Sequence, residues 1–248
     1  MLYYSEGTVF NSPAKTIVNT INCYGVMGAG IAKEFKMRYP EMYEDYVLRC
    51  KEKKVTVGHP YLFEYSHNQW ILNFPTKNHW KFPSKMDFIE SGLRYFVNNY
   101  QRRDFQSIAF PKLGTNNGGL EWKKVKELME YYLSNLDIDV YICTDEKKEA
   151  EGTEKLMIDL LNRIDIKDMK KKVKLTDKQM NVLNELLPVS RVRNLDLAKQ
   201  SGLGKQTYEN IFIFLYQSVV NKNDFEKTNN NEDTKIKQIK IEQVEMDF

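Results

Sequence analysis

Cysteine and histidine are scarce in this chain of 248 residues, which contains three of each. The cysteines, Cys23, Cys50 and Cys143, are odd in number and widely spaced, without a Cys-x-x-Cys pair. A disulfide framework or a structural zinc site is therefore not expected, and a reducing cytoplasm suits the sequence better. The histidines show no metal-ligand spacing either, so we expect no metal and no other cofactor.

Long apolar runs are also lacking. No run approaches the ~20 residues that a membrane-spanning helix needs, and the stretch Met1–Ser5 lacks the pattern of a signal peptide. Hydrophobic residues make up 42% of the chain and charged residues 29%, which suits a globular protein of one large or two smaller domains. The formal net charge is only +3, so charge alone predicts no nucleic-acid partner.

The strict dinucleotide fingerprint Gly-x-Gly-x-x-Gly is absent, although one glycine-rich stretch stands out. A β-branched run from Thr16 leads to Asn22 and then to Gly25, Gly28 and Gly30, after which a helix-like run begins. A strand that leads through glycines into a helix N-terminus can bind an anion, because backbone N–H groups and the positive end of the helix dipole face it. The alternative is a tight turn that binds nothing.

Strands and helices alternate along the first part of the chain. Apolar patterns predict strands at 2–4, 16–20, 61–65, 70–74, 107–111 and 139–143, with a hairpin between the third and the fourth. They predict helices at 31–50, interrupted at Pro40, after Ser84 as an N-cap, and at 122–136. This alternation predicts an α/β fold, a three-layer α/β/α sandwich with a mixed, mostly parallel sheet.

A second glycine-rich loop lies at 114–120, between the strand that Pro111 ends and the helix that begins at Trp122. Ligands of open α/β folds bind at the carboxyl ends of the strands, and both glycine loops should open there. Two anion-binding loops that face one another suit a diphosphate better than a single phosphate.

Three motifs of this chain resemble the macrodomain family, whose fold binds ADP-ribose. They are Gly25-Val-Met-Gly-Ala-Gly-Ile-Ala32, Asn73-Phe-Pro-Thr-Lys-Asn-His-Trp80 and Pro111-Lys-Leu-Gly-Thr-Asn-Asn-Gly-Gly-Leu-Glu-Trp122. Their order and separations are similar to the branch that contains DarG antitoxins and the terminal ADP-ribose protein glycohydrolase. DarG proteins remove ADP-ribose that a partner toxin has placed on thymine bases of DNA. We assign the resemblance to residues 1–150.

The resemblance implies a role for each matching residue. Asn22 would bind the distal ribose, and Lys77 would act on the anomeric carbon or stabilise the opened sugar. The two loops would hold the diphosphate through Gly28, Ala29, Gly30, Ile31, Gly114, Thr115, Asn116, Asn117, Gly118 and Gly119. Desolvation in a cleft would lower the pKa of Lys77, whereas a bound diphosphate would raise that pKa. The alternative for Lys77 is a solvated lysine at a strand end.

Two positions depart from the family pattern. The protein glycohydrolase has an aspartate in the second loop that assists its lysine, whereas this chain has Asn117-Gly118-Gly119 there. This difference favours the DarG branch. Many macrodomains carry an acidic residue after an early glycine to bind the adenine amino group. Here Thr8 follows Gly7, so Thr8 or a backbone amide is the candidate adenine contact.

His79 and Trp80 follow the candidate lysine closely and are candidate nucleic-acid contacts. An exposed tryptophan offers a stacking face to a flipped or single-stranded base, and His79 could protonate the leaving base. The alternatives are that Trp80 packs on the sheet edge and that His79 is a surface residue.

Beyond residue 150 the pattern becomes helical and highly charged. We interpret 151–174 as a helix at 153–164 followed by a charged linker, and 175–226 as a small helical module whose first helix Thr176 caps. Within it, 195–211 has the pattern of a helix-turn-helix with Gly202 at the turn. Its basic and acidic residues nearly balance, so partner binding is as good a hypothesis as DNA binding. The polar tail at 227–248 is predicted to be disordered.

The resemblance implies a hydrolase that removes ADP-ribose from ADP-ribosylated thymidine in DNA, with single-stranded DNA as the expected form. The predicted partners are ADP-ribose, ADP-ribosylated DNA and an ADP-ribosyltransferase toxin, to which this chain would be the cytoplasmic antitoxin. No membrane partner is expected. Two alternatives stay open: a reader that binds ADP-ribose without turnover, and a hydrolase that acts on ADP-ribosylated protein side chains.

Overall fold

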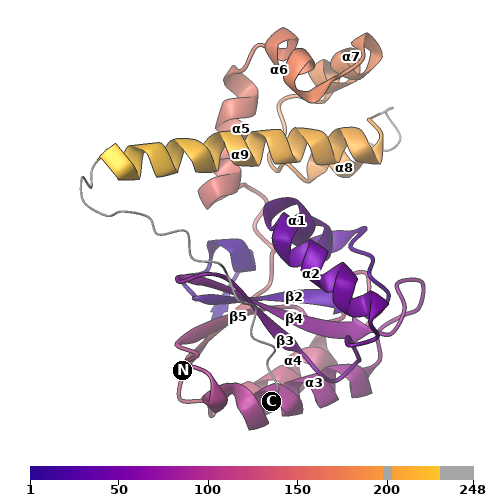
Figure 1. Ribbon diagram of the computed structural model, residues 1–248, viewed down its shortest axis with the longest axis vertical. Helices are drawn as coiled ribbons and strands as arrows, with labels where there is room; N and C mark the ends of the chain where they lie inside the picture. Colours follow the sequence, from indigo (N-terminus) through magenta and orange to yellow (C-terminus); the bar gives the residue numbers. More distant parts are fainter. Residues whose placement is uncertain (198–202, 230–248) are drawn as a thin grey trace. The chain divides into compact units, whose positions relative to one another are not determined.

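The computed structural model describes residues 1–197 and 203–229 (Figure 1). The described chain divides into two compact units, the first from Met1 to Glu146 and the second from Lys147 to Asn229.

A six-stranded sheet with the order β1-β6-β5-β2-β4-β3 forms the centre of the first unit. Neighbouring strands are parallel except for β3 and β4, which form the expected antiparallel hairpin. The mixed, mostly parallel sheet is therefore confirmed. The strands are β1 (Leu2–Ser5), β2 (Thr16–Asn22), β3 (Tyr61–Ser66), β4 (Gln69–Lys77), β5 (Ser107–Pro111) and β6 (Asp139–Cys143).

Helices cover both faces of this sheet and make the predicted three layers (Figure 1). The elements are η1 (Val9–Asn11), α1 (Gly30–Arg38), α2 (Pro40–Lys51), α3 (Met86–Asn99), η2 (Tyr100–Arg102) and α4 (Trp122–Leu133). On β2, Ile17 belongs to the core that contains Phe35 of α1, whereas Val18 belongs to the core that contains Leu93 of α3. This alternation is expected of a strand whose two faces are both buried.

The N-terminus of α3 differs from the prediction. Its N-cap is Lys85, not Ser84, and no side chain caps this helix. Ser84 is buried, and its N–H donates to the carbonyl of Gly118 at 2.9 Å. Ser84 lies one residue before the N-cap position, and from there it supports the second glycine loop.

The second unit consists of helices. They are α5 (Gly152–Arg163), α6 (Ile166–Val173), α7 (Asp177–Leu186), α8 (Asn194–Leu197) and α9 (Lys205–Asn229), with α9 packed against α5, α6 and α8. Thr176 caps α7, as the sequence predicts, and Gln179 completes a capping box with it.

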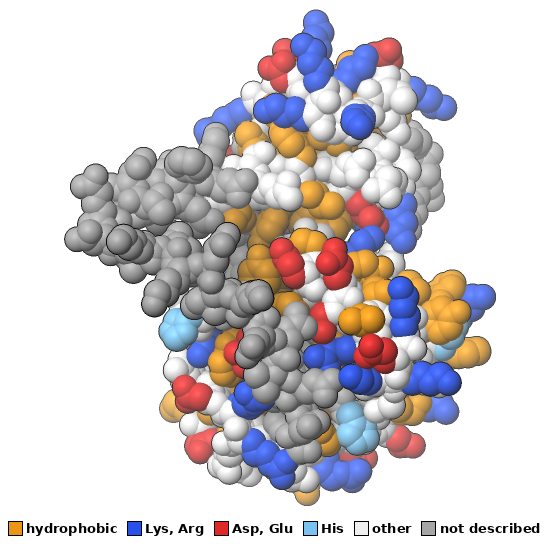
Figure 2. All heavy atoms as spheres, viewed as in Figure 1, with side chains coloured by type: hydrophobic (Ala, Val, Ile, Leu, Met, Phe, Trp, Pro, Cys, Tyr) orange, Lys and Arg blue, Asp and Glu red, His pale blue; other side chains and the backbone are white. Residues whose placement is uncertain are grey.

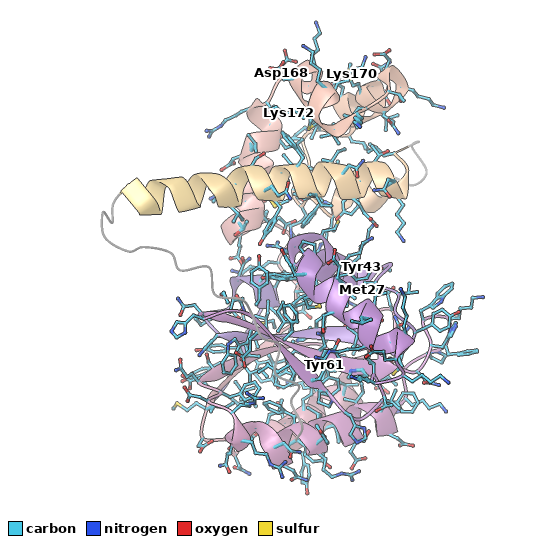
Figure 3. The ribbon with its side chains drawn as sticks, in the orientation of Figure 1. Met27, Tyr43, Tyr61, Asp168, Lys170 and Lys172 are labelled. Carbon is cyan, nitrogen blue, oxygen red and sulfur yellow. The ribbon has the colours of Figure 1, made fainter. Side chains whose placement is uncertain are left out.

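The charged linker expected at the end of 151–174 is wrong, because this stretch forms α6. Asp165 caps α6 by accepting the N–H of Lys167 at 2.8 Å. Met169 and Val173, four residues apart, are buried, whereas Lys170 and Lys172 project from the helix (Figure 3). The many lysines make the apolar stripe hard to recognise in the sequence, but a single stripe is enough to pack a short helix.

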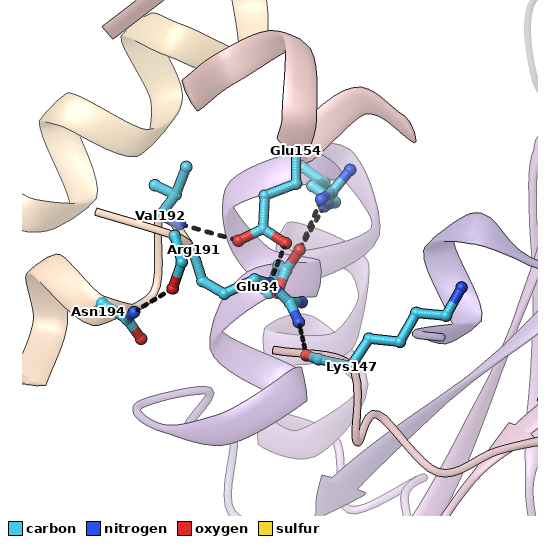
Figure 4. A network of polar contacts seen from close by, with 8 residues as sticks. Glu34, Lys147, Glu154, Arg191, Val192 and Asn194 are labelled. Carbon is cyan, nitrogen blue, oxygen red and sulfur yellow. Dashed lines mark hydrogen bonds and ion pairs between the residues drawn. The ribbon is translucent and has the colours of Figure 1, made fainter. Parts of the chain in front are cut away.

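A buried ion pair joins α5 to the segment after α7 (Figure 4). Arg191 Nε donates to Glu154 Oε2 at 2.7 Å, and the Arg191 guanidinium also donates to the carbonyl of Lys147 at 2.8 Å. Glu154 Oε1 accepts the N–H of Val192 at 2.8 Å. These bonds fix residues distant in sequence to one another within the second unit.

The predicted helix-turn-helix falls partly outside the described residues, because its turn lies in 198–202. Of the predicted disordered tail, 227–229 end α9 and the rest lies outside the described residues. Among the described helices, none is long and apolar enough to cross a membrane. Figure 2 shows lysine and arginine side chains interspersed with acidic ones on the visible face, which agrees with the small net charge.

Candidate functional site

The predicted site residues gather where the parallel strands end. β2 ends at Asn22 and β4 ends at Lys77, and a register shift after Ile21 places these two residues side by side. The N–H of Cys23 donates to the carbonyl of Lys77 at 3.0 Å. The sheet itself therefore holds the candidate ribose-binding residue next to the candidate catalytic residue.

Asn22 organises the first glycine loop. Its Oδ1 accepts the N–H groups of Tyr24 at 2.9 Å and Val26 at 3.4 Å, and its Nδ2 donates to the carbonyl of Val26 at 2.5 Å. This side-chain turn lets Gly25 adopt a φ of +91°. An amide nitrogen carries two hydrogens, so Nδ2 has a second one with which to donate to a ribose hydroxyl.

Tyr46 of α2 supports the same loop, a role that the sequence analysis missed. Its hydroxyl accepts the N–H of Gly25 at 3.1 Å and donates to Asn22, at 2.9 Å from the carbonyl and 3.0 Å from Oδ1. The side chain is fully buried, and burial raises the pKa of Tyr46 well above the usual range. A tyrosine rather than a phenylalanine on an apolar helix face was the available signal, since a buried hydroxyl needs partners.

The first loop ends at the N-terminus of α1. Ala29 is the N-cap and the helix begins at Gly30, so Gly28, Ala29, Gly30 and Ile31 surround the first turn. The backbone N–H groups of a first turn have no partner within their helix and point along its axis. They lie at the carboxyl edge of the sheet, as an anion site requires. Met27 comes just before these residues of the first loop and is buried. It lies near α2, from which Tyr43 projects (Figure 3).

The second loop is closed by its own backbone. The N–H of Gly119 donates to the carbonyl of Thr115 at 2.6 Å, and that of Leu120 donates to Gly114 at 3.1 Å. Thr115 Oγ1 donates to the carbonyl of Lys112 at 3.1 Å. Thr115 and Gly118 are buried, whereas Asn116, Asn117 and Gly119 are exposed.

The two loops face one another, as the sequence predicts. A Cβ atom placed on Gly30 would lie 2.5 Å from Nδ2 of Asn117. The Asn117 amide is therefore in direct contact with the start of α1. Backbone N–H groups of the first loop thus lie next to a polar side chain of the second.

Lys77 reaches the second loop from β4. Its ammonium group donates to the carbonyl oxygen of Asn117. Desolvation by burial lowers the pKa of Lys77, which is the direction expected in the absence of a diphosphate. The acceptor is a neutral carbonyl, so no carboxylate counteracts the effect of desolvation.

Thr8 lies at the other end of the same edge. It follows β1 and Gly7, whose carbonyl accepts the N–H of Asp145 at 3.1 Å, and its side chain makes no capping bond to η1. In the sheet order β1 and β4 are four strand spacings apart, or about 19 Å. The candidate adenine and ribose positions therefore lie on strands that are not neighbours in the sheet.

His79 and Trp80 lie in the loop after β4, together with Phe82. Trp80 is 45% exposed and Phe82 64% exposed, so Trp80 is not packed into the sheet edge. Tyr24 of the first loop is 60% exposed, and its ring centroid lies 4.3 Å from that of His79. The sequence analysis missed Tyr24 and Phe82, although aromatic residues within loops next to a predicted site were a usable signal.

Within the described part of the chain, no group of three or more His, Cys, Asp or Glu side chains could hold a metal ion. Burial raises the pKa of the Cys23 thiol to about 12 and that of the Cys50 thiol to about 11, so both are neutral at physiological pH. The amine of Lys77 is the candidate reactive group.

Comparison with known proteins places these features in a family. The Macro domain family model matches residues 18–129. The macrodomain of Mycobacterium tuberculosis DarG is 39% identical, with a TM-score of 0.56, over 58% of this chain and 97% of that chain. Thermosipho africanus DarTG in complex with ADP-ribose is 40% identical, with a TM-score of 0.56, over 60% of this chain and 43% of that chain.

The curated relatives of this chain include DNA ADP-ribosyl glycohydrolases. A DNA ADP-ribosyl transferase-DNA ADP-ribosyl glycohydrolase fusion protein of Thermosipho africanus is 39% identical over 155 residues, which cover 55% of this chain and 40% of that protein. This chain spans less than half the length of the curated glycohydrolases that it matches.

Proposed function

Because this chain belongs to the macrodomain family, with DarG proteins among its relatives, we propose that it is a hydrolase that removes ADP-ribose from thymidine in DNA. The observation that carries the proposal is the position of Lys77, which lies beside Asn22 and contacts the second glycine loop. Relatives that are 37–39% identical are named as DNA ADP-ribosyl glycohydrolases or contain one in a fusion protein, and these names support DNA as the substrate.

The ligand would lie along the carboxyl edge of the sheet. The diphosphate would bind where the two glycine loops meet, because the first turn of α1 supplies N–H donors there. The adenine would extend toward Thr8, and the distal ribose would reach Asn22 and Lys77. The separation of β1 and β4 in the sheet supports this arrangement.

In the proposed reaction, the neutral amine of Lys77 attacks the anomeric carbon of the distal ribose. The bond between this carbon and the thymine nitrogen breaks, and its electron pair leaves with the thymine imide, which delocalises the charge and then takes up a proton. Water afterwards releases the sugar from the lysine. The lowered pKa of Lys77 favours this chemistry, because it raises the fraction of neutral amine near pH 7.

The proposal includes a biological role, that of an antitoxin to a DNA ADP-ribosyltransferase. A relative in which transferase and glycohydrolase are fused in one chain supports this pairing of activities. An antitoxin of this kind would reverse the modification rather than block the toxin, so its protective effect would depend on Lys77.

The test compares Lys77→Ala with Lys15→Ala, a lysine that precedes β2 at the opposite edge of the sheet. The measurement is release of ADP-ribose from a single-stranded oligonucleotide with one ADP-ribosylated thymidine, together with calorimetric binding of free ADP-ribose. We expect Lys77→Ala to lose turnover, by about 100-fold or more, while it still binds ADP-ribose. Lys15→Ala should retain turnover.

Three results would contradict the proposal. Full turnover by Lys77→Ala would exclude the lysine mechanism. Binding of ADP-ribose without turnover by the unaltered protein would favour a reader. Release from ADP-ribosylated protein, and not from DNA, would assign the enzyme to the protein branch.

A further inference from the structure

Beside Lys77 lies a cluster of four aromatic rings, and it is not part of the ADP-ribose site described above. We define the aromatic platform as Tyr24, His79, Trp80 and Phe82. We propose that this platform binds unpaired bases next to the modified thymidine, so that the enzyme recognises a single-stranded segment and not only the ADP-ribosylated nucleotide. The inference rests on the proposed function and names the part of the substrate that the platform would hold.

The rings are held in place by one another. His79 is central: its ring centroid lies 4.3 Å from that of Tyr24, 5.7 Å from that of Trp80 and 5.5 Å from that of Phe82. The rings of His79 and Trp80 are nearly parallel, with an interplanar angle of 23°. The platform joins the first glycine loop to the loop after β4, so its shape does not depend on one flexible segment.

Three members of the platform are large hydrophobic side chains that remain in water. Tyr24, Trp80 and Phe82 are exposed by 60%, 45% and 64% of their surface, respectively. Single exposed aromatic residues are common, but several at one place usually mark a binding surface. Their outer faces are therefore available to a partner.

The charge next to the platform indicates which partner fits. Lys81 Nζ lies 5.2 Å above the Trp80 ring, and the backbone N–H of Lys81 donates to His79 Nδ1 at 3.2 Å. Lys85 is exposed on the same loop. Aromatic faces combined with lysines are what unpaired nucleic-acid strands bind, because bases stack on the rings and phosphates meet the cations. Stacked base pairs of a duplex would not offer these faces.

The position of the platform agrees with this partner. Asn22 accepts the backbone N–H of Tyr24 at 2.9 Å, and His79 follows Lys77 by two residues. A ribose held at Asn22 and Lys77 would carry its thymine toward the platform. The nucleotides on either side of that thymine would then come within reach of the rings.

The experiment uses Phe82→Ala and Tyr24→Ala in the full chain. Tyr131→Ala is the matched control, because Tyr131 is 77% exposed and lies in the last turn of α4. Each protein is assayed on ADP-ribosylated thymidine as a free nucleoside and within a single-stranded oligonucleotide. We expect each platform variant to raise KM for the oligonucleotide at least about fivefold with little change in kcat. Turnover of the nucleoside should not change, and Tyr131→Ala should match the unaltered protein on both substrates.

Equal KM values for the oligonucleotide in all proteins would overturn the inference, and so would a loss that falls equally on the nucleoside. A loss confined to an ADP-ribosylated protein substrate would assign the platform to a protein partner instead. If the unaltered protein hydrolyses neither thymidine substrate, the proposed function fails separately. The platform is then tested by fluorescence anisotropy with an unmodified oligothymidine, for which the same fivefold weakening is expected and equal affinities would overturn it.

Discussion

Gly118 and Gly119 are neighbours in the second glycine loop, but they must be glycine for different physical reasons. A Cβ on Gly118 would overlap the carbonyl group of Gly114 and lie 2.5 Å from Oγ of Ser84. A Cβ on Gly119 would meet nothing within 4 Å, but Gly119 has a φ of +78°. Gly118 therefore lacks room for a side chain, whereas Gly119 has room but a conformation that L residues rarely adopt.

The two alanine variants should differ in stability. Gly119→Ala adds only the left-handed strain, which costs about 1–2 kcal/mol. Gly118→Ala must displace backbone, at about 1–3 kcal/mol for overpacking, and weakens the bond from the buried Ser84 N–H, at about 1–3 kcal/mol more. We expect losses of about 1–2 kcal/mol and about 2–6 kcal/mol, respectively.

Urea unfolding followed by tryptophan fluorescence measures these losses, because Trp70, Trp80 and Trp122 all lie in the first unit. Asparagine tolerates the left-handed region, so Gly119→Asn should be milder than Gly119→Ala, whereas Gly118→Asn should be as severe as Gly118→Ala. Equal losses in the two alanine variants, or rescue of Gly118 by asparagine, would refute the reasoning. Gly118→Ala should also weaken ADP-ribose binding, since the adjacent Asn117 carbonyl meets Lys77.

Three further predictions concern buried or desolvated groups. The pKa of Lys77 is lowered, so this amine loses its proton at a lower pH than an ordinary lysine does. The rate of ADP-ribose release should therefore rise with pH and level off below pH ~10.4. A release rate that falls over this range would contradict the amine mechanism. Tyr46→Phe removes the hydroxyl that forms hydrogen bonds with Asn22 and Gly25. The free energy of unfolding, measured by fluorescence, should fall by about 1–3 kcal/mol. Calorimetry should show weaker binding of ADP-ribose. Arg191→Leu removes one partner of a buried ion pair. It should lower the free energy of unfolding of the second unit, measured by circular dichroism, by about 3–5 kcal/mol. The double variant with Glu154→Leu should recover most of this loss.

Local patterns were enough to predict the sheet and the edge at which the site lies. The apolar runs that became β2 and β5 are bounded by turn residues, and strands that alternate with helices must be mostly parallel. Parallel strands end at one edge, so two glycine loops that follow two of them had to open on the same side. That these loops meet, with Asn117 against Gly30, agrees with this prediction.

Contacts between residues distant in sequence could not be predicted in this way. Tyr24 and His79 are separated by 55 positions, and only the placement of Asn22 beside Lys77 brings their rings together. The turn that Asn22 makes with Val26 depends on the orientation of the Asn22 side-chain amide, which a sequence pattern does not specify. The helix α6 was missed because a run of lysines lies around its two buried apolar residues, and because its packing depends on α9 and α7, which follow later in the chain.

The carbonyl that Lys77 contacts bears on the choice between nitrogen-linked and ester-linked substrates. A carboxylate at this position would hold the lysine in its charged form and raise its pKa. The Asn117 carbonyl stabilises the ammonium ion much less, so desolvation dominates and the pKa falls. In the proposed reaction, the lowered pKa of Lys77 leaves a larger fraction of neutral amine to attack the sugar, and the thymine imide would carry away its own negative charge. The loss of the aspartate and the lowered pKa of Lys77 are therefore consistent with one another, and both suit a base as the leaving group.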